Sequence, residues 1–354
     1  MKPVDTRKTL WLHRVRLFGF LYLSALLMVV ASERIYWYWG GVTVDSILGL
    51  TLVYSIPAAA GLWALALTGG RQLHDVVLAG ALFAFVVEGV VTPIIYADGP
   101  LPLFAAMFVG WHGLVAFLGA WYLVRKWLLG GRVRLLLATS GLTGLAWGAW
   151  ARAAATAETL DAEEVAALLA EGIDTSVLTP GEFAIYAGLV GAIFMAGHWL
   201  VGYLWPQQWV PGRRSTRVVV LVAIGYMSLA VLPIVIWAPL KLAALVGGTV
   251  LLMKRTPTST RPSIIAQLYG LVPLRRVLTL LPLPIAASAS YWLVSVAAIS
   301  ENSLSGIYWS IVMTQVAGGA LAYVWAARRA LRKRIEWKTP TMDVIPSPEP
   351  NKRI

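Results

Sequence analysis

The sequence predicts an all-α, polytopic membrane protein, a bundle of about ten transmembrane helices with both chain termini in the cytoplasm. The chain is 58% hydrophobic and only 13% charged, whereas a soluble domain carries about 25% charged residues. Long apolar runs recur along it, most of them close to the about 20 residues that a helix needs to cross the hydrocarbon core. The Lys and Arg residues fall almost entirely in alternate gaps between these runs, which is the positive-inside pattern.

Ten segments qualify or nearly qualify as membrane spans. They are 17–38, 45–68, 76–97, 101–124, 133–153, 183–205, 217–237, 239–253, 277–300 and 305–327. With the N-terminus inside, the inner segments carry all but three of the 29 Lys and Arg residues, Arg125 and Lys126 among them. The three exceptions are Arg34, Arg152 and Lys241. This distribution predicts a multi-pass protein of the cell (plasma) membrane.

One of these spans is ambiguous. Segment 239–253 is short and begins with Pro239 and Lys241. It fits a tilted span in which Lys241 reaches the outer interface. A re-entrant pair with the preceding segment is the alternative, and it would reverse the orientation of everything that follows.

The segments between the spans also carry predictions. The long outer loop 154–182 contains a stretch typical of a short amphipathic helix. Segment 262–276 is too short to span and is predicted to be an interfacial helix on the inner face. Residues 1–338 then form a single transmembrane bundle, and the Pro-rich tail 339–354 is predicted to be disordered in the cytoplasm.

Composition also excludes several function classes. The net charge of +12 is divided among the loops, so it favours anionic lipid headgroups of the bilayer and not nucleic acid as a partner. The absence of Cys excludes disulfides, thiolate metal sites and iron–sulfur clusters. The sequence has no HExxH motif, no Walker A loop and no nucleophile elbow.

Glu88 and His112 are the strongest candidates for a functional site. Ionisable residues inside a span are costly, so they indicate function by default. The two residues lie on consecutive spans that a tight outer connection at 97–100 joins. At about 1.5 Å of rise per residue, both lie at a similar depth below that connection, which predicts that they meet. Such a pair could relay a proton, hold a cation or bind a polar ligand. A polar contact that only joins two helices is the alternative.

Glu33 and Arg34 lie in the last turns of the first span. They form either a local ion pair at the outer interface or, through Glu33, the mouth of a site that also contains Glu88 and His112. Arg152 and Lys241 are basic groups on the acidic outer side. They could bind an anionic substrate or pair with the outer acids.

His198 on the sixth predicted span extends the candidates to a metal or a haem. A bis-histidine haem between His112 and His198 is conceivable, with Glu88 as a further metal ligand. The two histidines are predicted to lie at different depths, which disfavours this arrangement.

Three hypotheses of function follow. The first is a secondary transporter or permease of a small solute or ion, with Glu88 and His112 as its binding or coupling site. The second is a membrane-embedded enzyme or a redox subunit that holds haem, quinone or metal through His112, His198 and Glu88. The third is a non-catalytic subunit of a membrane complex, which a protein partner contacts through the loop 154–182 or the segment 262–276.

Overall fold

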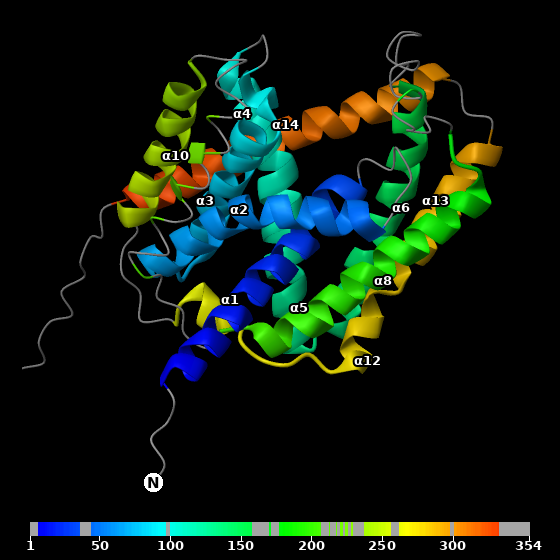
Figure 1. Ribbon diagram of the computed structural model, residues 1–354. Helices are drawn as coiled ribbons and strands as arrows, with labels where there is room; N and C mark the ends of the chain where they lie inside the picture. The colour runs from blue at the N-terminus through cyan, green and yellow to red at the C-terminus, as the bar shows by residue number, and fades with distance from the viewer. Residues whose placement is uncertain are drawn as a thin grey trace, which may run out of the picture.

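The computed structural model describes residues 6–35, 44–96, 100–157, 177–206, 237–255, 262–297 and 301–332, with isolated residues between 170 and 228. Within these residues the regular structure is helical and contains no strand (Figure 1). The elements are α1 (Thr6–Val29), η1 (Val30–Arg34), α2 (Val44–Thr68), α3 (Leu73–Val86), η2 (Val87–Val91), η3 (Pro93–Tyr96), α4 (Leu101–Phe108), η4 (Val109–Val124), α5 (Arg125–Gly130), α6 (Val133–Ala157), α8 (Pro180–Leu204), α10 (Ala238–Arg255), α11 (Ile264–Gln267), α12 (Leu274–Val277), η5 (Leu278–Leu280), α13 (Pro282–Val296) and α14 (Glu301–Leu331).

Seven helical segments of the described chain are long and apolar enough to cross a membrane, which is consistent with a polytopic membrane protein. They are His13–Arg34, Asp45–Thr68, Leu73–Val91, Leu101–Gly130, Pro180–Leu204, Leu274–Val296 and Ser303–Leu331. Of the other predicted spans, 133–153 lies in α6 and 239–253 in α10, which are not among the seven. Most of segment 217–237 and most of the loop 154–182 lie outside the described residues. The whole tail 339–354 also lies outside them. The count of ten spans and the cytoplasmic termini therefore stay predictions.

The helix α3 forms the centre of the bundle. It packs against α2, η4, α10 and α14, and all its residues from His74 to Val86 are buried. A helix that is apolar on all sides, as this one is, is expected in the interior. Its first turn is capped by Asp75, whose Oδ2 accepts hydrogen bonds from the backbone N–H groups of Arg71 (2.8 Å) and Gln72 (2.9 Å).

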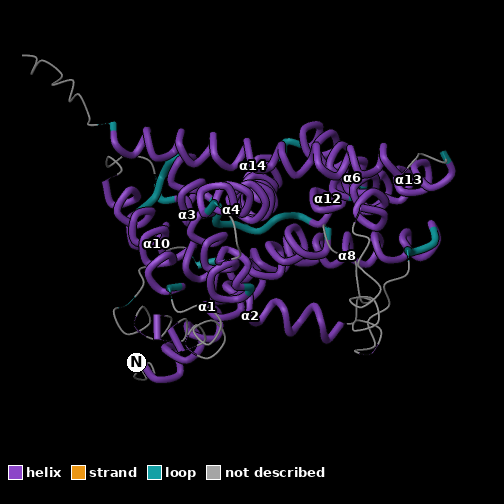
Figure 2. The backbone as a smooth tube through the Cα atoms, turned by 90° about the horizontal axis from the view of Figure 1, so that it is seen from above, coloured by secondary structure: helices purple, strands orange, loops and turns teal. Residues whose placement is uncertain are grey.

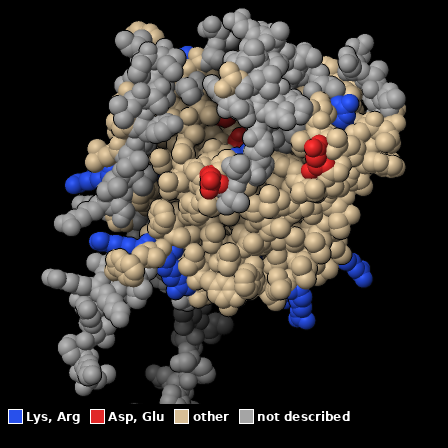
Figure 3. Space-filling model, turned by 45° about the vertical axis from the view of Figure 1, so that its right-hand side comes forward, with Lys and Arg blue, Asp and Glu red and all other residues tan. Residues whose placement is uncertain are grey.

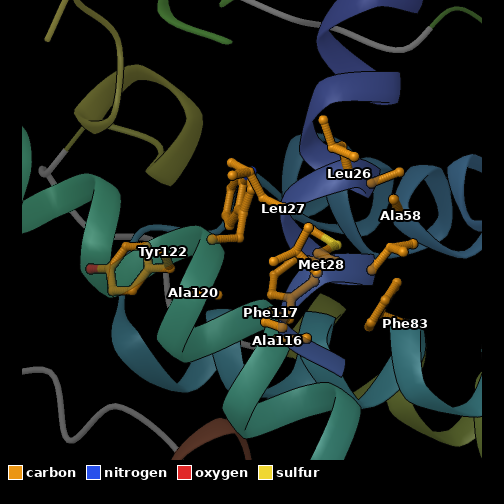
Figure 4. Close-up of a cluster of buried hydrophobic side chains, with 14 of the residues drawn as sticks. Leu26, Leu27, Met28, Ala58, Phe83, Ala116, Phe117, Ala120 and Tyr122 are labelled. Atoms are coloured by element: carbon orange, nitrogen blue, oxygen red, sulfur yellow. The ribbon is translucent and has the colours of Figure 1, made fainter. Parts of the chain in front are cut away.

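Large apolar side chains fill the space where α1, α2, α3 and η4 meet (Figure 4). Leu27 and Met28 of α1, Ala58 of α2, Phe83 of α3 and Phe117 of η4 are all fully buried. The rings of Phe83 and Phe117 lie 6.0 Å apart between centroids. This packing fixes the four helices that carry the polar residues described below.

A second close contact joins α6 to α13 through glycines. A Cβ atom on Gly144 would meet the carbonyl oxygen of Leu283, and one on Gly148 would meet the carbonyl oxygen of Ala287. The two backbones are therefore in direct contact, as small residues four apart permit in membrane helices. The Oγ of Ser290 also donates a hydrogen bond to the carbonyl of Leu145 at 2.8 Å.

Replacing Gly148 with alanine is expected to destabilise this contact. The new methyl group would overlap the backbone of α13, and the helices must separate, at a cost of about 1–3 kcal/mol. Gly188 of α8 is the matched control, because a Cβ there meets no atom within 4 Å. Thermal unfolding in detergent should show a lower midpoint than the wild type for Gly148→Ala and an unchanged midpoint for Gly188→Ala. Equal midpoints would contradict the close contact.

The long helix α14 runs obliquely along one side of the bundle (Figures 1 and 2). It packs against α3, α4, η4, α6 and α10. At the crossing with α4 and η4, a Cβ on Gly319 would meet the carbonyl oxygen of Ala106, and one on Gly110 would meet that of Gln315. The crossing brings Gln315 and the first half of α14 close to the η4 segment that carries His112.

The segment 262–276 differs from the single interfacial helix that the sequence predicts. It forms two short helices, α11 and α12, with non-helical backbone between them. Backbone carbonyls in this segment accept hydrogen bonds from buried side chains: Trp205 Nε1 donates to Ile265 (2.8 Å), and Arg125 donates to Leu268 and Gly270. The segment is irregular because its backbone groups bond to other helices of the bundle.

Arg125 is a second departure from the sequence prediction, which placed it among the charges of an inner loop. The residue is fully buried. Its Nη1 donates to the carbonyl of His198 at 2.9 Å, and its guanidinium lies 4.9 Å from the centre of the Trp205 ring. Backbone carbonyls and an aromatic face thus compensate the buried charge, as buried charges require.

The surface agrees with a membrane environment. On the face shown in Figure 3, uncharged residues dominate, most Lys and Arg side chains lie at the lower and lateral edges, and Asp and Glu lie in the upper part, in and beside a hollow. Many large apolar side chains are exposed, among them Leu142, Ile185 and Leu321. Exposed apolar area of this extent is expected where lipid and not water is the solvent.

Candidate functional site

Three helices of the bundle change from α-helical to π-helical hydrogen bonding, and each π-helical segment contains a Glu or His side chain. Glu33 lies in η1, Glu88 in η2 and His112 in η4. π-Helical turns are rare and are frequently found at functional sites. The coincidence of three such segments with buried Glu88, buried His112 and partly buried Glu33 marks this region as the candidate site.

The predicted contact between Glu88 and His112 is present. The Nε2 of His112 lies 2.6 Å from Oε1 of Glu88, and both side chains are almost completely buried. At this distance a proton lies between the two atoms, either on the imidazole or on the carboxyl group. The other carboxylate oxygen of Glu88, Oε2, accepts a hydrogen bond from the hydroxyl of Thr92 at 3.1 Å.

Glu33 completes a row of three groups. Its Oε1 lies 3.8 Å from Nδ1 of His112, so the imidazole stands between two carboxyl groups. The same oxygen accepts a hydrogen bond from the hydroxyl of Tyr54 at 2.6 Å. The sequence left two interpretations open for Glu33. In the structure Glu33 lies beside His112 and in the same row as Glu88.

Aromatic rings hold the imidazole in place. The ring of Phe83 lies 6.1 Å from that of His112, nearly perpendicular to it, and the ring of Tyr54 lies 6.5 Å away. Next to His112, Trp111 donates its Nε1–H to the carbonyl of Ser32 at 2.7 Å, which joins η4 to η1. These contacts fix the side chain between its two carboxyl partners.

A cavity of about 480 Å³ opens onto this row. Its polar lining comes from Glu33, Tyr54, Glu88, Thr92 and Gln315. The remainder is apolar and largely aromatic: Ile94, Leu103, Phe104, Met107, Phe108, Trp111, Trp150, Tyr308, Trp309, Val312, Met313 and Val316. Small-molecule sites have this size and this combination of apolar walls with a few polar groups.

The other predicted site residues lie elsewhere. Nη2 of Arg34 donates to Oγ of Ser46 at 3.4 Å, and the backbone carbonyl of Arg34 accepts a hydrogen bond from the Tyr186 hydroxyl. Within the described chain no ion pair joins Arg34 to Glu33. Arg152 on α6 and Lys241 on α10 do not line the cavity. The structure thus brings together Glu33, Glu88 and His112, and not the three basic residues.

His198 belongs to the region around Arg125. It is fully buried, its ring lies 4.7 Å from that of Phe194, and its carbonyl accepts the hydrogen bond from Arg125. Within the described residues no group of three or more Asp, Glu or His side chains is arranged to hold a metal ion. Both ring nitrogens of His112 face carboxyl groups.

Tyr54 and Thr92 are parts of the site that the sequence analysis did not select. Tyr54 lies in the middle of α2, away from the interfacial positions where tyrosine is common in membrane helices. Thr92 follows Glu88 by four residues, the spacing that places two side chains on one helix face. These positions could have indicated both residues, since hydroxyl groups are natural partners of a buried carboxylate.

The comparisons with known proteins add no assignment. No protein-family model matches this chain, and no curated protein and no solved structure matches it. The function is therefore inferred from the residues of the site.

Proposed function

We propose that the protein is a secondary transporter of a small solute in the cell membrane, which couples solute movement to protons held by Glu33, His112 and Glu88. The observation that carries this proposal is the buried imidazole between two carboxyl groups at the wall of a cavity. Three adjacent titratable groups can share and exchange protons over short distances. Ionisable groups placed in this way within membrane helices are typical of proton relays in pumps and transporters.

The energetics of burial support proton coupling. Net charge is costly in an apolar interior, so the row is most stable when its protons and nearby charges balance. Arg34 follows Glu33 directly in η1, so a cation lies next to the row along the chain. A solute that changes the charge in the cavity must then change the number of protons that the row holds. That linkage is the basis of coupled transport.

The helix geometry supplies a means of movement. The wide turns of η1, η2 and η4 lie at the level of the row. A local return of one turn to α-helical bonding would rotate its side chain relative to its neighbours. Rotations of this kind would open the cavity alternately to the two sides of the membrane.

The alternative of a bis-histidine haem has less support, because Nε2 of His112 is bonded to Glu88 at 2.6 Å and Nδ1 lies 3.8 Å from Glu33. His198 meanwhile packs beside Phe194 and Arg125.

The test is solute-driven proton movement. Purified protein is reconstituted into liposomes that contain a pH-sensitive dye, and amines, amino acids, sugars and carboxylates are added outside one class at a time. We expect at least one class to change the internal pH faster than in protein-free liposomes. The absence of a protein-dependent change with every class would contradict the proposal.

A further inference from the structure

The chemistry of the cavity points to the class of solute, an inference that rests on the proposed transport function. We propose that the cavity binds a monovalent organic cation, an amine or quaternary ammonium group that carries an apolar or aromatic substituent, and exchanges it for one proton.

The charged groups of the lining are all acidic. Among the residues that the structure describes, Glu33 and Glu88 are the charged residues that line the cavity, and no Lys or Arg lines it. Ionised carboxylates only accept hydrogen bonds and attract positive charge. An anionic solute would enter next to two carboxyl groups, with no cation in the described part of the wall, which disfavours anions strongly.

The aromatic surface fits a cation with an apolar body. Trp111, Trp150, Tyr308 and Trp309 line the cavity, and the rings of Trp150 and Tyr308 are stacked at 4.8 Å. The faces of Trp and Tyr rings attract ammonium groups, and aromatic cages are the usual protein sites for quaternary ammonium ligands. A sugar or another strongly hydrated solute would leave its hydroxyl groups without partners against these walls.

The number of protons exchanged follows from the titratable groups of the row and those next to it. These are Glu33, Glu88, His112 and Tyr54, with Arg34 nearby. Whatever number of protons makes this set neutral without solute, a bound monovalent cation makes it neutral with one proton fewer. Binding therefore releases one proton, and the exchange of one cation for one proton moves no net charge across the membrane.

The test compares ligands of similar size on the wild-type protein. Benzyltrimethylammonium is the cation, N,N-dimethylbenzamide the neutral ligand and phenylacetate the anion. Calorimetry in detergent, repeated in buffers with different ionisation enthalpies, measures affinity and the number of protons released. We expect saturable binding of the cation alone, with release of about one proton per cation. Equal binding of the neutral or anionic ligand, or cation binding without proton release, would overturn the proposal.

Variants locate the binding site. Trp309→Leu removes the aromatic face and should weaken cation binding roughly three- to ten-fold, whereas Trp309→Phe should retain most of the affinity. Glu182→Gln is the matched control, because Glu182 is exposed, lies outside the cavity lining and caps α8, a role that glutamine also performs. Equal affinities for Trp309→Leu and Trp309→Phe would contradict the aromatic contribution.

Failure of this inference and failure of the transport proposal give different results. If another solute class drives proton flux in liposomes and benzyltrimethylammonium does not bind, the cation assignment is wrong and the transporter stands. If the cation binds with proton release and no solute class drives proton flux, the binding site stands and transport is wrong.

Discussion

Replacing Glu88 with glutamine is expected to abolish solute-driven proton movement while the protein stays folded. Glutamine preserves the size of the side chain and can still bond to Thr92 and to His112, but its amide group cannot take up or release a proton. The proton between Glu88 and His112 would lose one of its two positions. We expect the internal pH of liposomes with Glu88→Gln to follow that of protein-free liposomes, whereas wild-type protein changes it.

Two controls make this result specific. Glu182→Gln removes an exposed carboxylate that does not line the cavity and should leave proton movement unchanged. The thermal midpoint of Glu88→Gln should lie close to that of the wild type, because the substituted side chain keeps its hydrogen-bond partners. Proton movement at the wild-type rate in a folded Glu88→Gln protein would show that Glu88 carries no proton in transport.

Replacing Arg125 with methionine should destabilise the protein more than any other single change considered. Methionine fills similar space but donates no hydrogen bond, so the carbonyls of His198, Leu268 and Gly270 would lose their donor in a dry interior. Each buried unsatisfied group costs about 1–3 kcal/mol, which predicts a total loss of about 3 kcal/mol or more in unfolding free energy. Arg125→Lys should recover only part of it, since an ammonium group lacks the planar fork of donors.

The neighbouring lysine is the control for charge alone. Lys126 is exposed, and its Nζ donates to the hydroxyl of Tyr122 at 3.2 Å. Lys126→Met removes the same formal charge from the same helix and should change stability by less than about 1 kcal/mol. Chemical unfolding in detergent measures both variants. Similar losses for Arg125→Met and Lys126→Met would show that the bonds of Arg125 to the segment 262–276 add nothing.

The contact between Glu88 and His112 could be predicted because it depends on local geometry. Few residues separate the two helices in the sequence, and similar distances along them from that short connection predict that both side chains lie at one depth. The sequence predicted the contact of Glu33 with His112 only as one of two alternatives. This contact depends on how α1 packs against η4. The two helices are distant in the chain, so no short connection fixes their relative position.

The close packing of α6 against α13 could be predicted only in part from the sequence. Gly144 and Gly148 are four residues apart, a spacing that permits one helix face to approach another helix closely. The identity of the partner helix is set by the three-dimensional packing, where the backbone of α13 at Leu283 and Ala287 meets that face.

Arg125 illustrates what sequence patterns do not contain. Its position next to Lys126, after a long apolar run, matches the loop charges of the positive-inside pattern. Its partners are backbone carbonyls of α8 and of the segment 262–276, and backbone groups leave no trace in composition or spacing. The same holds for the π-helical turns, which arise where packing between helices outweighs regular backbone bonding.

Nuclear magnetic resonance of the histidine side chains tests the central claim, that His112 and both carboxyl groups form one proton-binding unit. The chain has only four histidines, His13, His74, His112 and His198, so ¹⁵N-labelled histidine gives a simple spectrum in liposomes, and His112→Asn assigns the resonances of His112. We predict that Glu33→Gln and Glu88→Gln each shift the ring-nitrogen resonances of His112, and that Glu182→Gln shifts none. His112 resonances that respond to only one of the two cavity carboxylates, or to neither, would contradict the account.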